Sequence, residues 1–266
     1  MQGPLGGNRR VFSLVQSFHR CVLAPTIQDS ARSVGNTADT ISRPNQILSR
    51  LSEDRFSALS GALEPVTFAD GHVLYEAKGR IDRVYFPLTA VISIIQVMEE
   101  GTAAEVGMVG REGMAGLDAI LRDGTAAARH VCQVPGTALM MTTAALRRTV
   151  KEDENLLDAL LHYAGGYCAM LAQLIACNRL HRVEQRCARW LLMTVDRIAR
   201  SEFPMTQERL SMMLGAQRPT VTAVLTSLRD GGCLESSRGQ IRVVERKRLE
   251  SFACECYSTC ADYFEL

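Results

Sequence analysis

Residues 205–228 have the sequence MTQERLSMMLGAQRPTVTAVLTSL, which carries the signals for two short helices joined by a tight turn. Thr206 is a typical N-cap residue, and Gly215 supplies the left-handed conformation with which many helices end. Pro219 falls in the first turn of the second helix, where a missing N–H has no cost. Apolar residues recur at helical spacing in both segments. The stretch therefore predicts a helix-turn-helix.

The polar residues of this unit predict what it contacts. The apolar side chains of the second helix face inward, which leaves its N-terminal end polar and exposed. In helix-turn-helix proteins that end meets base edges in the major groove of DNA. Downstream, residues 234–243 fold back around Arg238 and Gly239 as a two-stranded wing whose arginines reach phosphates. The predicted DNA-binding residues are Thr206, Gln207, Gln217, Arg218, Thr220, Thr222, Arg238 and Arg242.

The charge distribution agrees with a polyanion-binding C-terminal part. The whole chain of 266 residues has a formal net charge of only +1. Residues 182–248, however, contain 13 basic and 7 acidic side chains, whereas residues 51–181 contain 11 and 16. A basic module joined to an acidic one favours a DNA-binding unit coupled to a separate sensor.

The central part of the chain has the pattern of an antiparallel β-roll. Short apolar, β-branched runs alternate with glycines from Glu64 to Met141, a spacing typical of a sandwich or roll. Residues 99–102 are the clearest hairpin tip. Short helices are expected before the roll, with Ser52 as an N-cap. The expected strands are residues 66–68, 73–75, 84–86, 91–97, 106–109, 131–134 and 138–141.

A long helix is expected at residues 153–178, followed by a second at residues 182–198 with one apolar face. The long helix carries two apolar stripes. One stripe faces the roll of its own chain, and the other is expected to form a dimer seam with a second copy. Gly165 and Gly166 permit close approach at the crossing. The predicted seam is Leu157, Leu161, Ala164, Cys168, Leu171 and Ile175; the stripe towards the roll includes Tyr163 and Tyr167.

Three segments resemble the Crp/Fnr family: residues 206–215, residues 217–221 and the preceding helix at residues 183–192. The resemblance extends over residues 45–250. It implies an α+β fold with a cyclic-nucleotide-binding-like β-roll, a long dimerisation helix and a C-terminal winged helix-turn-helix. It also implies a cytoplasmic, homodimeric transcription regulator, not an enzyme, whose partners are double-stranded DNA and RNA polymerase. Arg218 matches the family arginine that contacts bases, commonly guanine, which accepts two hydrogen bonds from a guanidinium.

The operator of the best-known family members is not assumed, because this chain has Pro219 and Ala223 where those members carry other base-reading residues. The expected domains are a disordered basic extension (1–44), a β-roll sensor (45–150), a dimerisation helix (151–180), a winged helix-turn-helix (181–250) and a cysteine-containing C-terminal helix or tail (251–266).

The resemblance also indicates where an effector would bind. Family sensors hold a cyclic phosphate with the N–H groups of a short helix and with an arginine from a short Arg-Ser/Thr-Ala sequence, called the cassette. The position of this cassette arginine is Ala127 in this chain. Burying a phosphate without a paired cation is costly, so cyclic AMP is not the expected effector. Arg129 lies two residues further along the chain, so a phosphate contact from this arginine in place of residue 127 remains an alternative. The candidate effector pocket is Gly110, Arg111, Glu112, Gly113, Arg129, Tyr163 and Tyr167.

No cofactor or metal site is expected. An oxygen-sensing iron–sulfur cluster of the kind that some family members carry needs a group of cysteines near the N-terminus, where only Cys21 lies. Haem ligation by His72 or His130 stays open, although a lone histidine in a strand is more often structural. Cys233, Cys254, Cys256 and Cys260 form a thiol switch, a soft-metal site or, in the favoured interpretation, small buried side chains.

Two alternatives to a DNA-binding regulator remain. One is a thiol hydrolase that pairs a cysteine with His162 or His181, although no second half of such a site is found. The other is a cyclic-nucleotide- or redox-responsive module that acts through a protein partner. No membrane partner is expected, because no run approaches 18 uncharged apolar residues.

Overall fold

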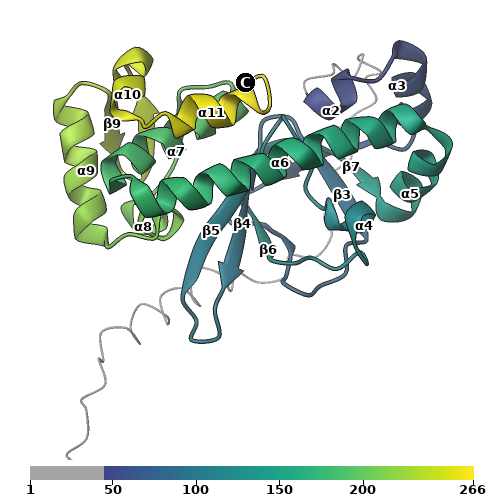
Figure 1. The fold of residues 1–266 in the computed structure, drawn as a ribbon, viewed down its shortest axis with the longest axis horizontal. Coiled ribbons are helices and arrows are strands. Elements are labelled where there is room, and N and C mark those ends of the chain that lie inside the picture. Colours follow the sequence, from purple (N-terminus) through teal and green to yellow (C-terminus); the bar gives the residue numbers. More distant parts are fainter. Residues whose placement is uncertain (1–44) are drawn as a thin grey trace, which may run out of the picture.

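The computed structural model describes residues 45–266, and the expected N-terminal extension at residues 1–44 lies outside them. The architecture is the predicted α+β arrangement of a β-roll, a long helix and a C-terminal helical unit with a small sheet (Figure 1). The helices are α2 (Gln46–Ser49), α3 (Glu53–Ser60), α4 (Asp118–Leu121), α5 (Thr143–Glu152), α6 (Glu154–Leu180), α7 (Val183–Ile198), α8 (Gln207–Leu214), α9 (Arg218–Asp230), α10 (Arg246–Phe252) and α11 (Cys256–Asp262).

The β-roll consists of two antiparallel sheets with strand orders β1-β7-β3 and β2-β6-β4-β5. All seven expected strands are confirmed, as is the β4–β5 hairpin around Gly101, whose φ is 85°. The strands are β1 (Glu64–Phe68), β2 (Val73–Tyr75), β3 (Arg83–Pro87), β4 (Val91–Val97), β5 (Ala103–Val109), β6 (Arg129–Val134) and β7 (Gly136–Thr142). Their inward side chains form a dry core, since Val84, Phe86 and Val91 are fully buried.

Helix α6 crosses the front of the roll and runs from α5 to the C-terminal helices (Figure 1). The stripe expected to face the roll does so: Leu156, Leu160 and Met170 are fully buried, and Tyr163 nearly so. The opposite face remains exposed, with Leu161 at 48% and Ile175 at 72% of their free surface. The helix is therefore apolar on two sides but covered on one.

Two seam positions differ from the prediction. Ala164 is 8% exposed within one protomer, and Leu171 packs against Gly107 of β5. Gly165 instead has open space around it, whereas Gly166 lies against the C-terminal residues Tyr263 and Phe264. The open line along α6 therefore passes through Leu161, Gly165, Cys168, Ala172 and Ile175, which still alternates steps of four and three.

Helix α6 also corrects the expectation about long apolar runs. Its 27 residues include an 18-residue window of mean hydropathy 1.3, which is enough by length and composition to cross a membrane. It is the one such helix in the part of the chain described, residues 45–266. One side of it is part of the protein core, and 28% of this window is buried within the protomer.

Helix α7 differs from the expected single apolar face, because it is buried almost all round from Arg186 to Ile198. It lies between the roll, α9 and the C-terminal helices, and for that reason even Arg189 and Arg197 are buried. It ends at Ala199, a non-glycine residue with φ 52°.

The wing contains one strand more than expected. Strands β9 (Leu234–Ser237) and β10 (Gln240–Val243) form the predicted hairpin, and β8 (Glu202–Pro204) pairs with the other edge of β10. Pro204 ends the strand at its edge, a position that proline tolerates. The chain before the helix-turn-helix is thus tied to the wing that follows it.

Candidate nucleic-acid interface and sensor pocket

Helices α8 and α9 form the helix-turn-helix that the sequence predicts. The hydroxyl of Thr206 accepts a hydrogen bond from the backbone N–H of Arg209 at 3.2 Å and caps α8. Gly215 ends α8 in the left-handed conformation, with φ 56°. Gln217 then stands at the N-cap position of α9 in an extended conformation, and Pro219 occupies the first turn. Thr206 is therefore a structural cap, whose hydroxyl is already engaged.

The N-terminal end of α9 is an open polar surface at one extremity of the molecule (Figure 1). The side chains of Gln217, Arg218, Thr220 and Thr222 are all exposed, while Val221 and Leu225 on the opposite side are buried. The guanidinium of Arg218 has no ion pair with any carboxylate among residues 45–266. A free cation at this position has the geometry to enter a groove of DNA.

Three further predicted residues have partners within the protein. The hydroxyl of Thr222 donates to the side-chain oxygen of Gln207 at 2.8 Å, which links α9 to α8. On the wing, Arg242 pairs with Glu235 of the neighbouring strand. Arg238 lies at the wing tip with φ 48°, followed by Gly239 with φ 78°, as in a two-residue turn of the primed type. The eight predicted residues thus lie in one helix-turn-helix and wing, with Arg218 and Arg238 the least engaged arginines.

The helix-turn-helix is attached to the sensor roll by polar contacts. Arg209 of α8 pairs with Asp70 at 2.6 Å and donates to the carbonyl of Gln133 at 3.3 Å. The indole N–H of Trp190 on α7 donates to Glu105 of β5 at 2.9 Å. These contacts give the roll a direct mechanical link to the DNA-binding helices.

Glu105 is the titratable group at this link. Burial raises its pKa to about 7, although hydrogen bonds from Ser93 and Trp190 and the charges of Arg189 and Arg197 oppose the rise. Ser93 donates to the second carboxylate oxygen at 2.6 Å. The contact between roll and α7 therefore changes its charge near neutral pH.

The predicted effector pocket brings five of its seven residues together, but their own side chains and one arginine fill the space between them. A Cβ atom at position 113 would lie only 2.2 Å from the ring of Tyr163. A Cβ atom at position 110 would lie 2.6 Å from the side chain of Arg197. Tyr167 lies beside Tyr163, with ring centroids 5.8 Å apart. Burial raises the pKa of both tyrosines, so they stay neutral.

Glu112 and Arg197 form a fully buried ion pair at the centre of this region. The Arg197 Nε donates to Glu112 Oε1 at 2.8 Å, and neither side chain has exposed surface. The backbone N–H of Gly110 donates to the same carboxylate oxygen, whereas Oε2 has no partner within residues 45–266. Arg197 comes from α7, so a residue of the C-terminal half completes the interior of the β-roll.

The other two predicted pocket residues make different contacts. Arg129 pairs with Glu76 at 3.1 Å. Arg111 lines a separate open cleft of about 510 Å³ together with Asp196, Arg200 and Arg246. At the expected cassette position, the backbone N–H of the exposed Ala127 donates to Asp118 at 3.0 Å.

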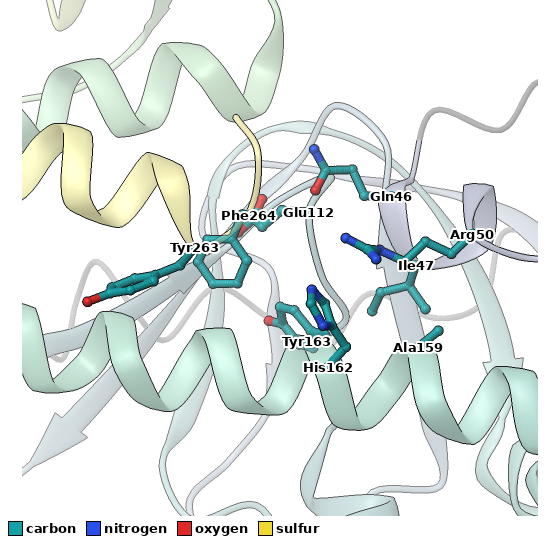
Figure 2. Close-up of a pocket in the computed structure, with 9 residues that line it drawn as sticks. All are labelled: Gln46, Ile47, Arg50, Glu112, Ala159, His162, Tyr163, Tyr263 and Phe264. Carbon is teal, nitrogen blue, oxygen red and sulfur yellow. The ribbon is translucent and has the colours of Figure 1, made fainter.

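A cavity of about 10 Å³ remains beside Glu112, between α6, α2 and the C-terminal end of the chain (Figure 2). His162 and Tyr163 of α6, Gln46 of α2 and Phe264 face it. This volume is the least that holds one water molecule, whereas pockets for small ligands have about 300–1,000 Å³.

Sequence reasoning missed Arg197, Glu105 and Arg209, because charged residues within helix and strand patterns usually face solvent. One signal was present for Arg197: it follows Met193 by four residues on a helix whose neighbouring positions are almost all apolar. The structure also describes His72 and His130, the two histidines considered as haem ligands. Burial lowers the pKa of both, and His130 Nδ1 lies 3.1 Å from the carbonyl of Ala128.

Two family models match the chain and together cover both halves. A cyclic nucleotide-binding domain matches residues 65–153, and a Crp-like helix-turn-helix domain matches residues 185–252. A CRP-like cAMP-activated global transcriptional regulator from Mycobacterium tuberculosis is 24% identical over 202 residues, which are 73% of this chain and 89% of that protein.

Solved structures share the fold at low sequence identity. FixK2 from Bradyrhizobium japonicum superimposes with a TM-score of 0.61 at 17% identity, covering 72% of this chain and 98% of its own. The c-di-GMP responsive global regulator CLP from Xanthomonas campestris gives a TM-score of 0.58 at 11% identity, with 72% and 99% coverage. At these identities the likeness establishes the arrangement of elements.

Proposed function

This chain belongs to the Crp/Fnr family of transcription regulators, and we propose that it is a homodimeric, sequence-specific DNA-binding regulator controlled through its β-roll by an effector other than cyclic AMP. Its DNA-binding unit is the winged helix-turn-helix, and its site of action is the cytoplasm. As in the family at large, RNA polymerase is the proposed protein partner.

The observation that carries the proposal is the N-terminal end of α9. Gln217, Arg218, Thr220 and Thr222 are exposed there, and the Arg218 guanidinium has no internal carboxylate partner among residues 45–266. Arginine in this position donates two hydrogen bonds to guanine, which discriminates against the wrong base. The wing arginines supply contacts to flanking phosphates.

The test is selection of genomic DNA fragments by the purified full chain, followed by sequencing. Enrichment of a two-fold symmetric sequence with half-sites about one helical turn apart, 10–10.5 bp, supports the proposal. Binding to all fragments alike at physiological salt contradicts it, because non-specific binding alone is sequence-independent.

Dimerisation through α6 is supported by its uncovered apolar line. Leu161 and Ile175 are large and exposed, and Gly165 has open space where a partner helix can approach closely. The opposite face of α6 is used by the roll of the same protomer. A second copy of α6 across a two-fold axis covers this line with the same residues from each side.

The double variant Leu161→Glu with Ile175→Glu tests this seam, since it places like charges across the axis. Light scattering is expected to show monomers. The matched control is Leu121→Glu with Val244→Glu, which changes two exposed apolar residues elsewhere and leaves the dimer intact. Dimers in both double variants contradict the seam.

The filled sensor pocket supports an effector other than cyclic AMP. Tyr163, Tyr167 and Arg197 occupy the space next to Gly110 and Gly113, and the expected cassette position is Ala127. The named relatives differ in effector, one cAMP-activated and one c-di-GMP responsive, so the shared fold does not select a ligand.

Calorimetry with cyclic AMP tests the effector proposal. No heat of binding is expected at millimolar nucleotide. Micromolar affinity that disappears in Arg129→Ala would contradict the proposal and show that the phosphate contact lies along the strand.

A further inference from the structure

Four side chains that commonly ligate metals meet where α6 ends: Cys177, His181, Cys254 and Cys256. Their ligand atoms all lie within 4.8 Å of one another. Cys177 Sγ and Cys254 Sγ are 3.5 Å apart, as are Cys256 Sγ and His181 Nδ1. Two of these residues lie one helical turn apart, and the other two come from the segment that begins α11. The fold therefore brings together donors separated by more than 70 residues.

The donor set and its spacing suit a tetrahedral metal ion. Zinc in structural sites is bound by four cysteine or histidine ligands, with Zn–S near 2.3 Å and Zn–N near 2.0 Å. In a regular tetrahedron these bond lengths separate the ligand atoms by roughly 3.5–3.8 Å. The two closest pairs already have such separations. All three cysteines are buried, with 5% or less of their surface exposed.

The neighbouring side chains have the arrangement of an outer shell. A metal-bound histidine usually donates its second ring N–H to a carboxylate, which fixes the orientation of the ring. His181 Nε2 lies 3.3 Å from Glu255 Oε1 and leaves Nδ1 facing the cysteines. Gln173 Nε2 donates to Cys256 Sγ at 3.1 Å, which favours a thiolate at that sulfur.

A buried cation beside the cluster supports a negative charge on it. Arg189 is 4% exposed, its Nε has no hydrogen-bond partner, and no carboxylate within residues 45–266 pairs with it. The guanidinium acts electrostatically on Cys177 and Cys260, which places it near the cluster. Three thiolates, one neutral imidazole and Zn²⁺ carry one net negative charge. Arg189 forms no ion pair with a carboxylate in residues 45–266, so its charge contributes to balancing that of the cluster, while it also acts electrostatically on Glu105.

We propose that Cys177, His181, Cys254 and Cys256 bind one structural Zn²⁺ per protomer. On binding, three thiols lose their protons to solvent and form three Zn–S bonds, while neutral His181 gives a Zn–N bond through Nδ1. No electron is transferred. Cysteine spacing alone predicts no metal here, because no histidine lies near residues 254–260 in sequence; the fold supplies His181 from the far end of α6.

The position of the site defines what the ion does. His181 is the extended residue between α6 and α7, with φ −102° and ψ 150°. Cys254 lies between α10 and α11, and Cys256 is the first residue of α11. The ion ties the hinge between the long helix and the DNA-binding half to the C-terminal segment. This role does not depend on which DNA the protein binds.

Two other uses of the cluster are less consistent with its geometry. A catalytic Cys256–His181 pair needs access for substrate, but Cys256 is only 1% exposed. A disulfide between Cys177 and Cys254 does not explain why Cys256 and His181 lie beside them, or why His181 contacts Glu255. Cys233 and Cys260 lie outside the group of four.

The experiment measures metal content in the full-length protein purified without chelator, by plasma mass spectrometry. We expect about one zinc per protomer. Cys254→Ser and Cys256→Ser are expected to lose at least 90% of it. The matched control is Cys260→Ser, another buried cysteine of α11, which retains it. Because some variants risk misfolding, the wild-type protein is also stripped and titrated with Co²⁺, whose tetrahedral ligand-field bands and thiolate charge-transfer band are expected at one equivalent.

The proposal is overturned by any of three results. The first is wild-type protein that contains less than a tenth of an equivalent of zinc and gives an octahedral cobalt spectrum. The second is equal zinc loss in Cys260→Ser and Cys256→Ser. The third is a Cys177–Cys254 disulfide found by peptide mass spectrometry in freshly purified protein. Each readout is obtained without DNA, so failure here leaves the DNA-binding proposal untouched.

Discussion

Two arginines in the C-terminal half show how differently this fold treats the same side chain. Arg218, at the start of α9, is exposed and has no carboxylate partner within residues 45–266, whereas Arg197 of α7 is fully buried against Glu112 of the roll. The first leaves a cation free for an external anion. The second is paired with a carboxylate inside the β-roll. The proposed DNA-binding surface is therefore open, while the predicted effector pocket is filled by side chains of the protein itself.

The largest expected effect comes from breaking the buried ion pair. Arg197→Ala leaves Glu112 buried without a cation, which is expected to lower the free energy of unfolding by about 3–5 kcal/mol. Urea unfolding at a fixed protomer concentration measures this loss. The double variant Arg197→Met with Glu112→Gln removes both charges and is expected to recover most of it. A loss below about 1 kcal/mol in the single variant would mean that water reaches the site.

The open arginine is expected to matter for DNA and not for folding. Arg218→Ala should weaken binding to the selected operator about 10- to 100-fold, because a bidentate contact to guanine contributes roughly 1–3 kcal/mol of discrimination. Binding to random DNA should change little. Fluorescence anisotropy on both DNAs measures the ratio, with Arg229→Ala at the other end of α9 as the control. Equal losses on the two DNAs would reduce Arg218 to a backbone contact and shift base reading to Gln217 and Thr222.

The comparison of Arg218 with Arg197 also shows which features could be predicted from the sequence. The strands, the long helix and the exposed end of α9 follow from local periodicity and capping residues such as Thr206 and Gly215, and all are found. Arg197 and Glu112 are 85 residues apart, and nothing local distinguishes a buried arginine from a solvated one. The same reason hid the pairing of His181 with Cys256, 75 residues away.

Missing elements and shifted positions also have physical causes. Strand β8 is three residues long and ends in Pro204, so its pairing with β10 depends on tertiary contact. Ala164 and Leu171 fit a heptad equally well on either side of α6, and only the position of the roll decides which neighbour they face. The domain boundaries drawn from the sequence remain predictions.

The link between roll and α7 gives an intermediate effect that depends on pH. Glu105 has a pKa raised to about 7 by burial, above its ordinary value, so the folded state binds a proton that the unfolded state releases. Stability from this group is present below its unfolded pKa and is lost as pH rises to about 7, on the order of 1–2 kcal/mol. Unfolding between pH 5 and 8 should show this decline.

Glu105→Gln tests the assignment, because the amide keeps an acceptor for Trp190 and cannot ionise. Its stability is expected to vary less with pH than that of the wild type. Glu99→Gln, at the tip of the β4–β5 hairpin, is the control and should retain the wild-type slope. If the two variants have the same pH dependence, another group governs it.

The smallest expected effect is on the wing, where Arg242 is intermediate between the two arginines compared above. It is exposed, yet it pairs with Glu235 across β9 and β10. If it also contacts a phosphate, Arg242→Ala should weaken binding to operator and to random DNA alike, by a few fold, and lower the slope of log affinity against log salt by about one.

Glu235, the ion-pair partner of Arg242, allows a sharper test, because it competes with the phosphate for the same guanidinium. Glu235→Gln should therefore strengthen binding to both DNAs slightly, and most at low salt, where charge interactions are least screened. A salt titration of both variants on both DNAs measures these effects. If Arg242→Ala leaves the slope unchanged, the charge of Arg242 is neutralised by Glu235 and makes no phosphate contact. In that case Arg238, at the wing tip, is the arginine that contacts the DNA backbone.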